Sequence, residues 1–134
     1  MNAGRLLRST GYDTPELRAE LAPVDPDDIN VWPAAPLMRR LWRPGISGVT
    51  INKMVFVDPA MMSGDRDRLA RLIIHELVHV RQFVLSGYLT FMGRYLLQYG
   101  TGRIAGKTGR QAYLDIAAEA EARDVAARAR KITR

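Results

Sequence analysis

Cysteine is absent from this chain of 134 residues, and histidine occurs only twice, as His75 and His79. The absence of cysteine excludes disulfide scaffolds, thiolate zinc sites and cysteine nucleophiles. The length corresponds to one domain, which can bury a hydrophobic core without covalent cross-links. We therefore expect residues 1–134 to form a single domain, in which any chemistry that needs an imidazole depends on these two side chains.

Long uninterrupted apolar runs are also missing. The most apolar stretch, residues 83–99, contains Ser86, Gly87, Arg94 and Gln98, which predicts a buried or interfacial segment and no transmembrane segment. The arginines at positions 5 and 8 are not followed by the apolar stretch of a signal peptide. We therefore expect a cytoplasmic location.

Acidic residues are outnumbered, with 20 Lys and Arg against 14 Asp and Glu and a net charge of +6. Such an excess can indicate a nucleic-acid-binding protein. The arginines are dispersed along the chain, however, and no nucleic-acid-binding motif accompanies them. A GC-rich genome would give the same bias toward arginine and alanine. We therefore expect no nucleic-acid partner.

The first third of the chain carries few signals of regular structure. Prolines interrupt it at positions 23, 26, 33, 36 and 44. Only Thr14-Pro15-Glu16 has the N-cap and the first-turn proline of a helix, which we expect to extend to about Leu21. Residues 1–44 are thus predicted to be a mostly irregular N-terminal segment, followed by the core at residues 45–134.

The core begins with residues 45–57, which are rich in β-branched side chains and predict a strand. Asn52-Lys53 is either a hairpin turn or the exposed part of one long strand. A helix from Asp65 or Asp67 to about Leu85 is apolar nearly all round, which predicts its burial. A helix at 88–99, a glycine-rich connector and a final helix at 110–131 follow. The predicted fold class is α+β, mostly helical, with a short β-hairpin or small antiparallel sheet before the central helix.

Residues 75–79 read His-Glu-Leu-Val-His on the central helix, which is the H-E-x-x-H arrangement of zinc proteases. Because residues four apart lie on one helical face, His75 and His79 can bind one metal ion. Zinc lowers the pKa of its bound water and polarises the scissile carbonyl, and Glu76 can act as the general base. The alternative, two ordinary helix histidines, requires the costly burial of unpaired polar groups.

A catalytic zinc ion needs a third protein ligand, and without another histidine or a cysteine this ligand must be an oxygen. The downstream carboxylates of the predicted last helix are all candidates: Asp115, Glu119, Glu121 and Asp124. Metzincins carry a histidine six residues after the second histidine of the motif. That position holds Leu85 here, which excludes the metzincin class.

The motif at 75–79, followed by Val80-Arg81-Gln82 and later by Glu119-Ala120-Glu121-Ala122, resembles the gluzincin metallopeptidases, and most of all the minimal soluble minigluzincins. The resemblance covers roughly residues 46–125. It implies a zincin-like domain, Zn²⁺ as cofactor, and Glu119 as the third ligand with Glu121 as the alternative. It also implies that the strand within 49–57 is an edge strand, to which a peptide substrate adds as a further strand.

Proteases of this type often add a donor that stabilises the tetrahedral oxyanion. Because no histidine is left, the candidates are Tyr113, near the third ligand, or Tyr88, Tyr95 and Tyr99, of which Tyr113 is preferred. Tyr88, Tyr95 and Tyr99 are interpreted as packing residues. Such families also often place an acidic residue four after the ligand glutamate, where this chain has Arg123. The orientation of the histidines must then come from elsewhere, such as a backbone carbonyl.

The function predicted from these residues is that of a zinc-dependent metallopeptidase acting on a peptide or protein substrate. The alternative is a non-proteolytic zinc-binding scaffold or interaction module of the same fold. The small size favours the alternative, because 134 residues leave little protein for subsite walls. Glu76 favours the enzyme, because a purely structural zinc site has no use for a general base.

Overall fold

The computed structural model of this chain describes residues 1–40, 42 and 46–132. The fold is α+β and mostly helical, as predicted. The elements follow in the order α1 Ala3–Thr10, α2 Pro15–Leu21, the 3-10 helix η1 Pro26–Asp28, β1 Val31–Pro33, α3 Pro36–Arg40, β2 Gly48–Ile51, β3 Met54–Val57, α4 Pro59–Met62, α5 Arg66–Ser86, α6 Tyr88–Ile104, α7 Gly109–Leu114 and α8 Ala117–Arg128.

The sheet has three strands in the order β1-β3-β2. β2 and β3 form the predicted antiparallel hairpin, in which Ile51 pairs with Met54 across a two-residue turn. Asn52 in that turn has φ 56°, a left-handed conformation that asparagine tolerates well. β1 was not predicted, and it pairs with β3 in parallel. The sheet is therefore mixed, with β3 in the centre and β2 at an edge.

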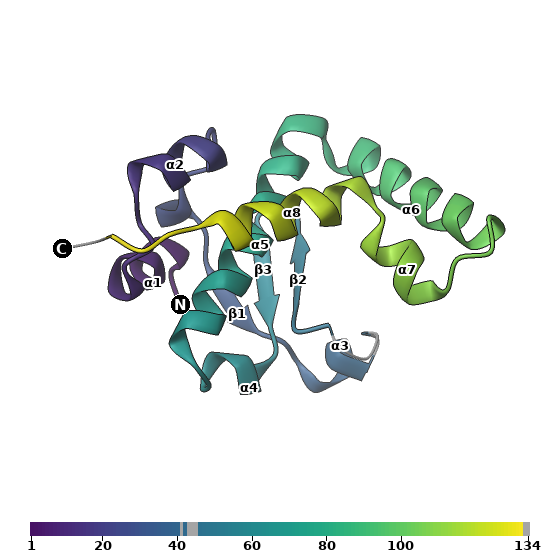
Figure 1. Cartoon of the computed structure of the whole chain (residues 1–134). Helices are drawn as coiled ribbons and strands as arrows, with labels where there is room; N and C mark the ends of the chain where they lie inside the picture. Colours follow the sequence, from purple (N-terminus) through teal and green to yellow (C-terminus); the bar gives the residue numbers. More distant parts are fainter. Residues whose placement is uncertain (41, 43–45, 133–134) are drawn as a thin grey trace.

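Helix α5 is the centre of the molecule. Asp65 caps its N-terminus by accepting hydrogen bonds from the backbone N–H groups of Asp67 and Arg68. One of its faces contacts β2 and β3, and other faces contact α1, α2, α4, α6 and α8. Figure 1 shows α8 crossing in front of α5, with α1 and α2 on one side of the molecule and α6 and α7 on the other. The all-round burial predicted for this helix follows from that arrangement.

The N-terminal segment is more regular than the sequence indicates, which corrects the prediction for residues 1–44. Helix α1, capped by Asn2 and ended by Gly11 at φ 85°, was not predicted. It buries Leu6 and Leu7, and α2 buries Leu21, in the same hydrophobic core as α5. The predicted boundary at positions 44 and 45 lies outside the described residues.

The C-terminal half also differs from the prediction. Helix α6 continues through Gly100 and Gly102 to Ile104, where a flexible connector was expected. The expected final helix is two helices, because the backbone is extended at Ile116 and turns this side chain into the interior, where it is 1% exposed. The break frees α8 to change direction and cross α5.

No helix in the described part of the chain is both long and apolar enough to cross a membrane.

Candidate metal centre

Two helices bring the predicted ligand side chains together. His75 and His79 lie on α5, and Glu119 lies in the first turn of α8. The His75 Nε2 atom is 3.1 Å from one carboxylate oxygen of Glu119, and the His79 Nε2 atom is 3.0 Å from the other. The three possible ligand atoms lie within 4.8 Å of one another. Two imidazole nitrogens and one carboxylate oxygen therefore converge on one point.

Close packing of α8 on α5 fixes the place of Glu119. The face of α8 that meets α5 carries small side chains, Ala122 and Ala126, which permit a close approach of the two backbones. The start of α8 is fixed by Gln98 of α6, whose side-chain oxygen accepts a hydrogen bond from the N–H of Ala117 at 2.8 Å. Glu119 is consequently only 4% exposed, although it is 40 positions beyond His79 in sequence (119 − 79).

The charges of this cluster are strongly coupled. Burial by itself raises the pKa of Glu119, but the hydrogen bonds of His75 and His79 outweigh burial and hold this pKa well below its usual range. Burial lowers the pKa of His79, but its hydrogen bond to Glu119 and the nearby charge of Glu76 raise the net value to about 9. A carboxylate that stays ionised beside two imidazoles is a donor set that suits a divalent transition metal.

Glu76 is oriented differently from the ligands. Its side chain is 3% exposed and accepts a hydrogen bond of 2.6 Å from the Thr50 hydroxyl of β2. Gly48 lies beside it, and a Cβ atom at this position would come within 3.1 Å of a Glu76 carboxylate oxygen. Burial raises the pKa of Glu76, although the two histidines oppose the rise. The carboxylate is therefore held in a dry recess between α5 and the edge strand.

Gln82 supports His79 from the next turn of α5. The His79 Nδ1 atom is 2.8 Å from the Gln82 side-chain oxygen. The Gln82 amide in turn donates to the backbone oxygen of Ala118 on α8 at 3.0 Å. The side-chain amide of Gln82 thus orients the His79 ring, a role for which the sequence suggested a backbone carbonyl. With Nδ1 held in this way, the Nε2 atom of His79 faces Glu119.

Two tyrosines approach the same carboxylate. The Tyr95 hydroxyl of α6 donates to a Glu119 oxygen at 3.2 Å, and Tyr113 of α7 lines the same pocket as Glu119. Burial and the charge of Glu119 raise the pKa of both phenols above the usual range, so both remain protonated donors at neutral pH. Tyr113 therefore lies where it was predicted, and Tyr95, which was interpreted as a packing residue, lies beside it.

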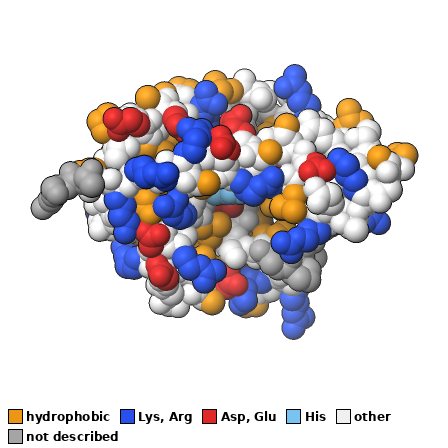
Figure 2. Space-filling view, viewed as in Figure 1, with side chains coloured by type: hydrophobic (Ala, Val, Ile, Leu, Met, Phe, Trp, Pro, Cys, Tyr) orange, Lys and Arg blue, Asp and Glu red, His pale blue; other side chains and the backbone are white. Residues whose placement is uncertain are grey.

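A pocket of about 210 Å³ opens onto these groups. Figure 2 shows histidine and acidic side chains at the bottom of a hollow near the middle of the displayed face. One wall is the edge strand β2, and the opposite walls come from α5, α6, α7 and α8. The lining residues are Ile46, Gly48, Val49, Thr50, Glu76, His79, Phe83, Phe91, Met92, Tyr95, Tyr113 and Glu119.

The other carboxylates considered as ligands lie elsewhere. Glu121 is exposed and contacts Arg81 at 3.8 Å and the Gln82 amide at 3.4 Å. Asp115 pairs with Lys107, and Asp124 pairs with Arg128 on the outer face of α8. Because residues two apart on a helix point in different directions, Glu119 and Glu121 cannot both face α5. Among the described residues, only Glu119 reaches both histidines.

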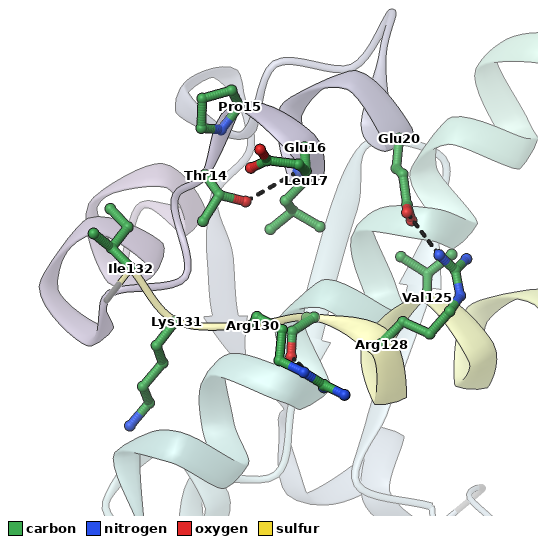
Figure 3. A pocket seen from close by; sticks show the side chains of 11 residues that line it. Thr14, Pro15, Glu16, Leu17, Glu20, Val125, Arg128, Arg130, Lys131 and Ile132 are labelled. Atoms are coloured by element: carbon green, nitrogen blue, oxygen red, sulfur yellow. Dashed lines mark hydrogen bonds and ion pairs between the residues drawn. The ribbon is translucent and has the colours of Figure 1, made fainter. Parts of the chain in front are cut away.

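A larger cavity, of about 470 Å³, lies far from the histidines between α2 and the C-terminal segment. In Figure 3, Leu17 and Val125 point toward it, and Glu20 closes one side through its ion pair with Arg128. No histidine is among the residues that line this cavity, so it has no cluster of possible metal ligands comparable with the one at His75.

Two residues of the site, Gly48 and Thr50, were not identified from the sequence, and a third, Tyr95, was considered but interpreted as a packing residue. The hairpin register places Gly48 and Thr50 on the same face as the buried Val55 and Val57, so alternation along the strand could have assigned them to the α5 side. Tyr95 lies four residues after the buried Phe91, on the inner face of α6, and this spacing was its only signal.

No known protein-family model matches this chain, and no curated protein or solved structure is similar enough to count as a match. The assignment of the site rests on its motif and on its geometry.

Proposed function

We propose that this protein is a zinc-dependent metallopeptidase that hydrolyses peptide bonds. The observation that carries the proposal is the convergence of His75, His79 and Glu119 at one point, with the carboxylate of Glu76, which is not one of the three, in the pocket that His79 and Glu119 line. A ligand set and a separate buried carboxylate are the two parts that hydrolysis by an activated water needs.

The donor set fits zinc. Two imidazole nitrogens and one carboxylate oxygen are the protein ligands of one class of catalytic zinc site, which keeps a further position open. Because the pKa of His79 is about 9 without a metal, zinc binding would displace a proton from this imidazole. His75, His79 and Glu119 would hold the ion. When bound there, zinc would supply a Lewis acid that activates water and polarises a carbonyl.

Glu76 has the chemistry of a general base. The Thr50 hydroxyl fixes one of its oxygens, and Gly48 leaves space beside the other. Because burial raises its pKa, Glu76 can take a proton from the attacking water and return it to the leaving amine nitrogen. Tyr95 and Tyr113, both protonated at the same pocket, are placed to donate a hydrogen bond to the oxyanion that develops on the carbonyl oxygen.

The edge strand supports a peptide as the substrate. β2 pairs with β3 on one side only, and its residues Gly48, Val49 and Thr50 line the pocket. An extended peptide can add to this free edge through backbone hydrogen bonds, which places one of its carbonyl groups beside Glu76. Phe83, Phe91 and Met92 form the apolar part of the pocket and favour an apolar side chain next to the scissile bond.

The test separates metal binding from proteolysis. We expect the purified protein to bind one zinc ion, measured by elemental analysis, and to cleave members of a peptide library. Glu119→Gln should reduce zinc content and cleavage together, and Glu76→Gln should abolish cleavage and leave zinc content unchanged. Glu121→Gln is the matched control, because this exposed glutamate lies two residues away on the same helix.

The outcomes discriminate between the two functions. A protein that neither contains zinc nor gains thermal stability from added zinc would refute the metal site. Zinc bound at His75 without cleavage of any peptide would favour the scaffold. A loss of zinc in Glu121→Gln, with zinc retained in Glu119→Gln, would reverse the ligand assignment.

A further inference from the structure

Helix α6 presents an apolar face to the outside of the molecule. Its inner face carries Phe91 and Gly102, which are buried, and Tyr95, which faces the pocket. The residues on the opposite side recur at spacings of three and four, as one helical face requires: Leu89, Gly93, Leu96, Gly100 and Ile104, with Leu97 next to them. Leu89 is 83% exposed and Ile104 is 89% exposed, so this outer face of α6 has no partner among the described residues.

The charges that α6 itself carries are all of one sign. The sequence has no Asp or Glu from Leu77 to Leu114, whereas α6 carries Arg94 and Arg103, and Arg110 follows in α7. Arg103 lies beside the outer face, and Arg94 lies nearer to α8, in a pocket that Glu121 also lines. These three arginines form no ion pair within the part of the chain that the structure describes. In Figure 2, the end of the molecule that carries α6 and α7 in Figure 1 is mostly white, with scattered orange and blue side chains and little red.

We propose that the outer face of α6 docks on the surface of an anionic lipid bilayer. Exposed leucines and an isoleucine next to arginines can bind at the interface of an anionic bilayer, with the helix in the plane of the membrane. Its apolar side chains enter the boundary of the acyl chains, and its arginines contact the acidic headgroups. The glycines at 93 and 100, with no atom within 4 Å of an added Cβ, let the face approach the bilayer closely.

Docking in this way has a consequence for the pocket. The inner face of α6 supplies Phe91, Met92 and Tyr95 to the pocket, and the outer face would lie on the bilayer. The pocket would then be held about one helix diameter, ~10 Å, from the membrane surface.

The charges argue against a second copy of this chain as the partner. A symmetric dimer through α6 would place Arg94 and Arg103 of one copy against the same cationic helix of the other. Because α6 carries no acidic residue, no ion pair could form across that interface, and like charges would repel. An anionic bilayer offers acyl chains to the leucines and acidic headgroups to the arginines.

The experiment is co-sedimentation of the full chain with vesicles, which needs no bound zinc. We expect binding to vesicles of phosphatidylcholine with phosphatidylglycerol, little binding to phosphatidylcholine alone, and weaker binding as salt increases. The double variant Leu89→Ser/Leu96→Ser should weaken binding about tenfold or more, since both leucines would enter the lipid boundary. Leu37→Ser is the matched control, because Leu37 is 72% exposed on α3.

Two results would overturn the proposal. The first is that the wild-type chain does not sediment with the anionic vesicles, a result that requires no variant. The second is that light scattering finds a dimer in the wild type and a monomer in Leu89→Ser/Leu96→Ser, which would assign the outer face of α6 to a second copy. Retained zinc content in that double variant would separate a failure of docking from a failure of the metal site.

Discussion

At the scale of the residue, the candidate centre depends on side chains that touch the motif from other elements. Thr50 fixes one oxygen of Glu76, the other faces the space left by Gly48, and Gln82 holds His79 through its Nδ1 atom. Thr50, Gly48 and Gln82 are not among the five residues of the motif. They decide where the free oxygen of Glu76 and the Nε2 atom of His79 point.

Replacement of Gly48 by alanine should therefore reduce catalysis without removing the metal. The added Cβ would lie 3.1 Å from Glu76 Oε1, closer than ordinary contact, so the carboxylate must shift. A displaced catalytic group costs about tenfold to a hundredfold in kcat. The measurement is kcat on a cleaved peptide together with zinc content. Gly100→Ala, where nothing lies within 4 Å, is the control, and an unchanged kcat in Gly48→Ala would contradict the placement of Glu76.

Replacement of Gln82 by leucine should weaken zinc binding. The variant removes the partner of His79 Nδ1, so the ring loses its fixed orientation, and zinc affinity should fall about 10- to 100-fold. Competition with a chromophoric chelator measures this change. Gln82→Glu keeps an acceptor for Nδ1 and should restore most of the affinity. Equal affinities in the leucine and glutamate variants would mean that Gln82 does not orient His79.

At the scale of the element, the N-terminal helices are held together by a charged cluster. Arg8 of α1 contacts Asp27 of η1 at 2.6 Å, and Arg18 of α2 contacts Asp13 and Asp25, each at 2.7 Å. The approach is possible because residue 4 is glycine. A Cβ at this position of α1 would overlap the Asp27 carboxylate and lie 3.0 Å from its backbone nitrogen.

Gly4→Ala should destabilise the protein, although alanine is the better helix former. The overlap with Asp27 forces α1 and η1 apart, which we expect to cost about 1–3 kcal/mol in the free energy of unfolding. Urea denaturation measures it. In an Asp27→Ala background much of the side-chain overlap disappears, so the same substitution should cost less. An equal cost in both backgrounds would show that the contact does not limit the packing of α1.

At the scale of the whole molecule, the two ends of the chain meet at the start of α5. The Tyr12 hydroxyl donates to Asp67 at 2.6 Å, and the Lys131 ammonium contacts the same carboxylate at 2.9 Å. Near the other end of α8, the chain is fixed to α5 by the cluster of His75, His79 and Glu119. Distant parts of the sequence are thus joined to one central helix at two places.

The first junction predicts a dependence of stability on pH. Hydrogen bonds from Tyr12 and Lys131 lower the pKa of Asp67. Since the folded-state pKa lies below the unfolded value of about 4, Asp67 stabilises the fold above that pH and loses this effect as pH falls through the folded pKa. The difference in unfolding free energy between wild type and Asp67→Asn should therefore shrink in acid. A difference independent of pH would contradict this, and Tyr12→Phe should reduce the dependence.

The second junction predicts that zinc stabilises the fold. An ion that binds only the folded chain, at a free concentration 100 times its Kd, raises the free energy of unfolding by about 2.7 kcal/mol. We expect Tm to rise with added zinc and to fall again with a chelator. The effect should be absent in Glu119→Gln, in which α8 no longer contributes a ligand. A rise in Tm that persists in that variant would place the ion elsewhere.

The sequence by itself determined the parts of the protein that depend on near neighbours in the chain. The spacing of His75, Glu76 and His79, the cap at Asp65 and the turn at Asn52 are set by local backbone geometry. Helix α5 was therefore predicted correctly, and the β2–β3 hairpin was one of the two alternatives that the sequence left open. Helix α1 and the break at Ile116 were missed. Both depend on burial in the tertiary structure, which local propensity does not report.

Only the tertiary structure decided which distant groups join the motif. The spacing left several carboxylates open, and a resemblance favoured Glu119. The packing of α8 on α5 turns Glu119 inward and leaves Glu121 exposed. The same packing brings Thr50, Tyr95 and Tyr113 to one pocket from a strand and two helices. Their convergence depends on the directions in which α6, α7 and α8 cross the core, and those directions follow from the fit of side chains across the whole molecule.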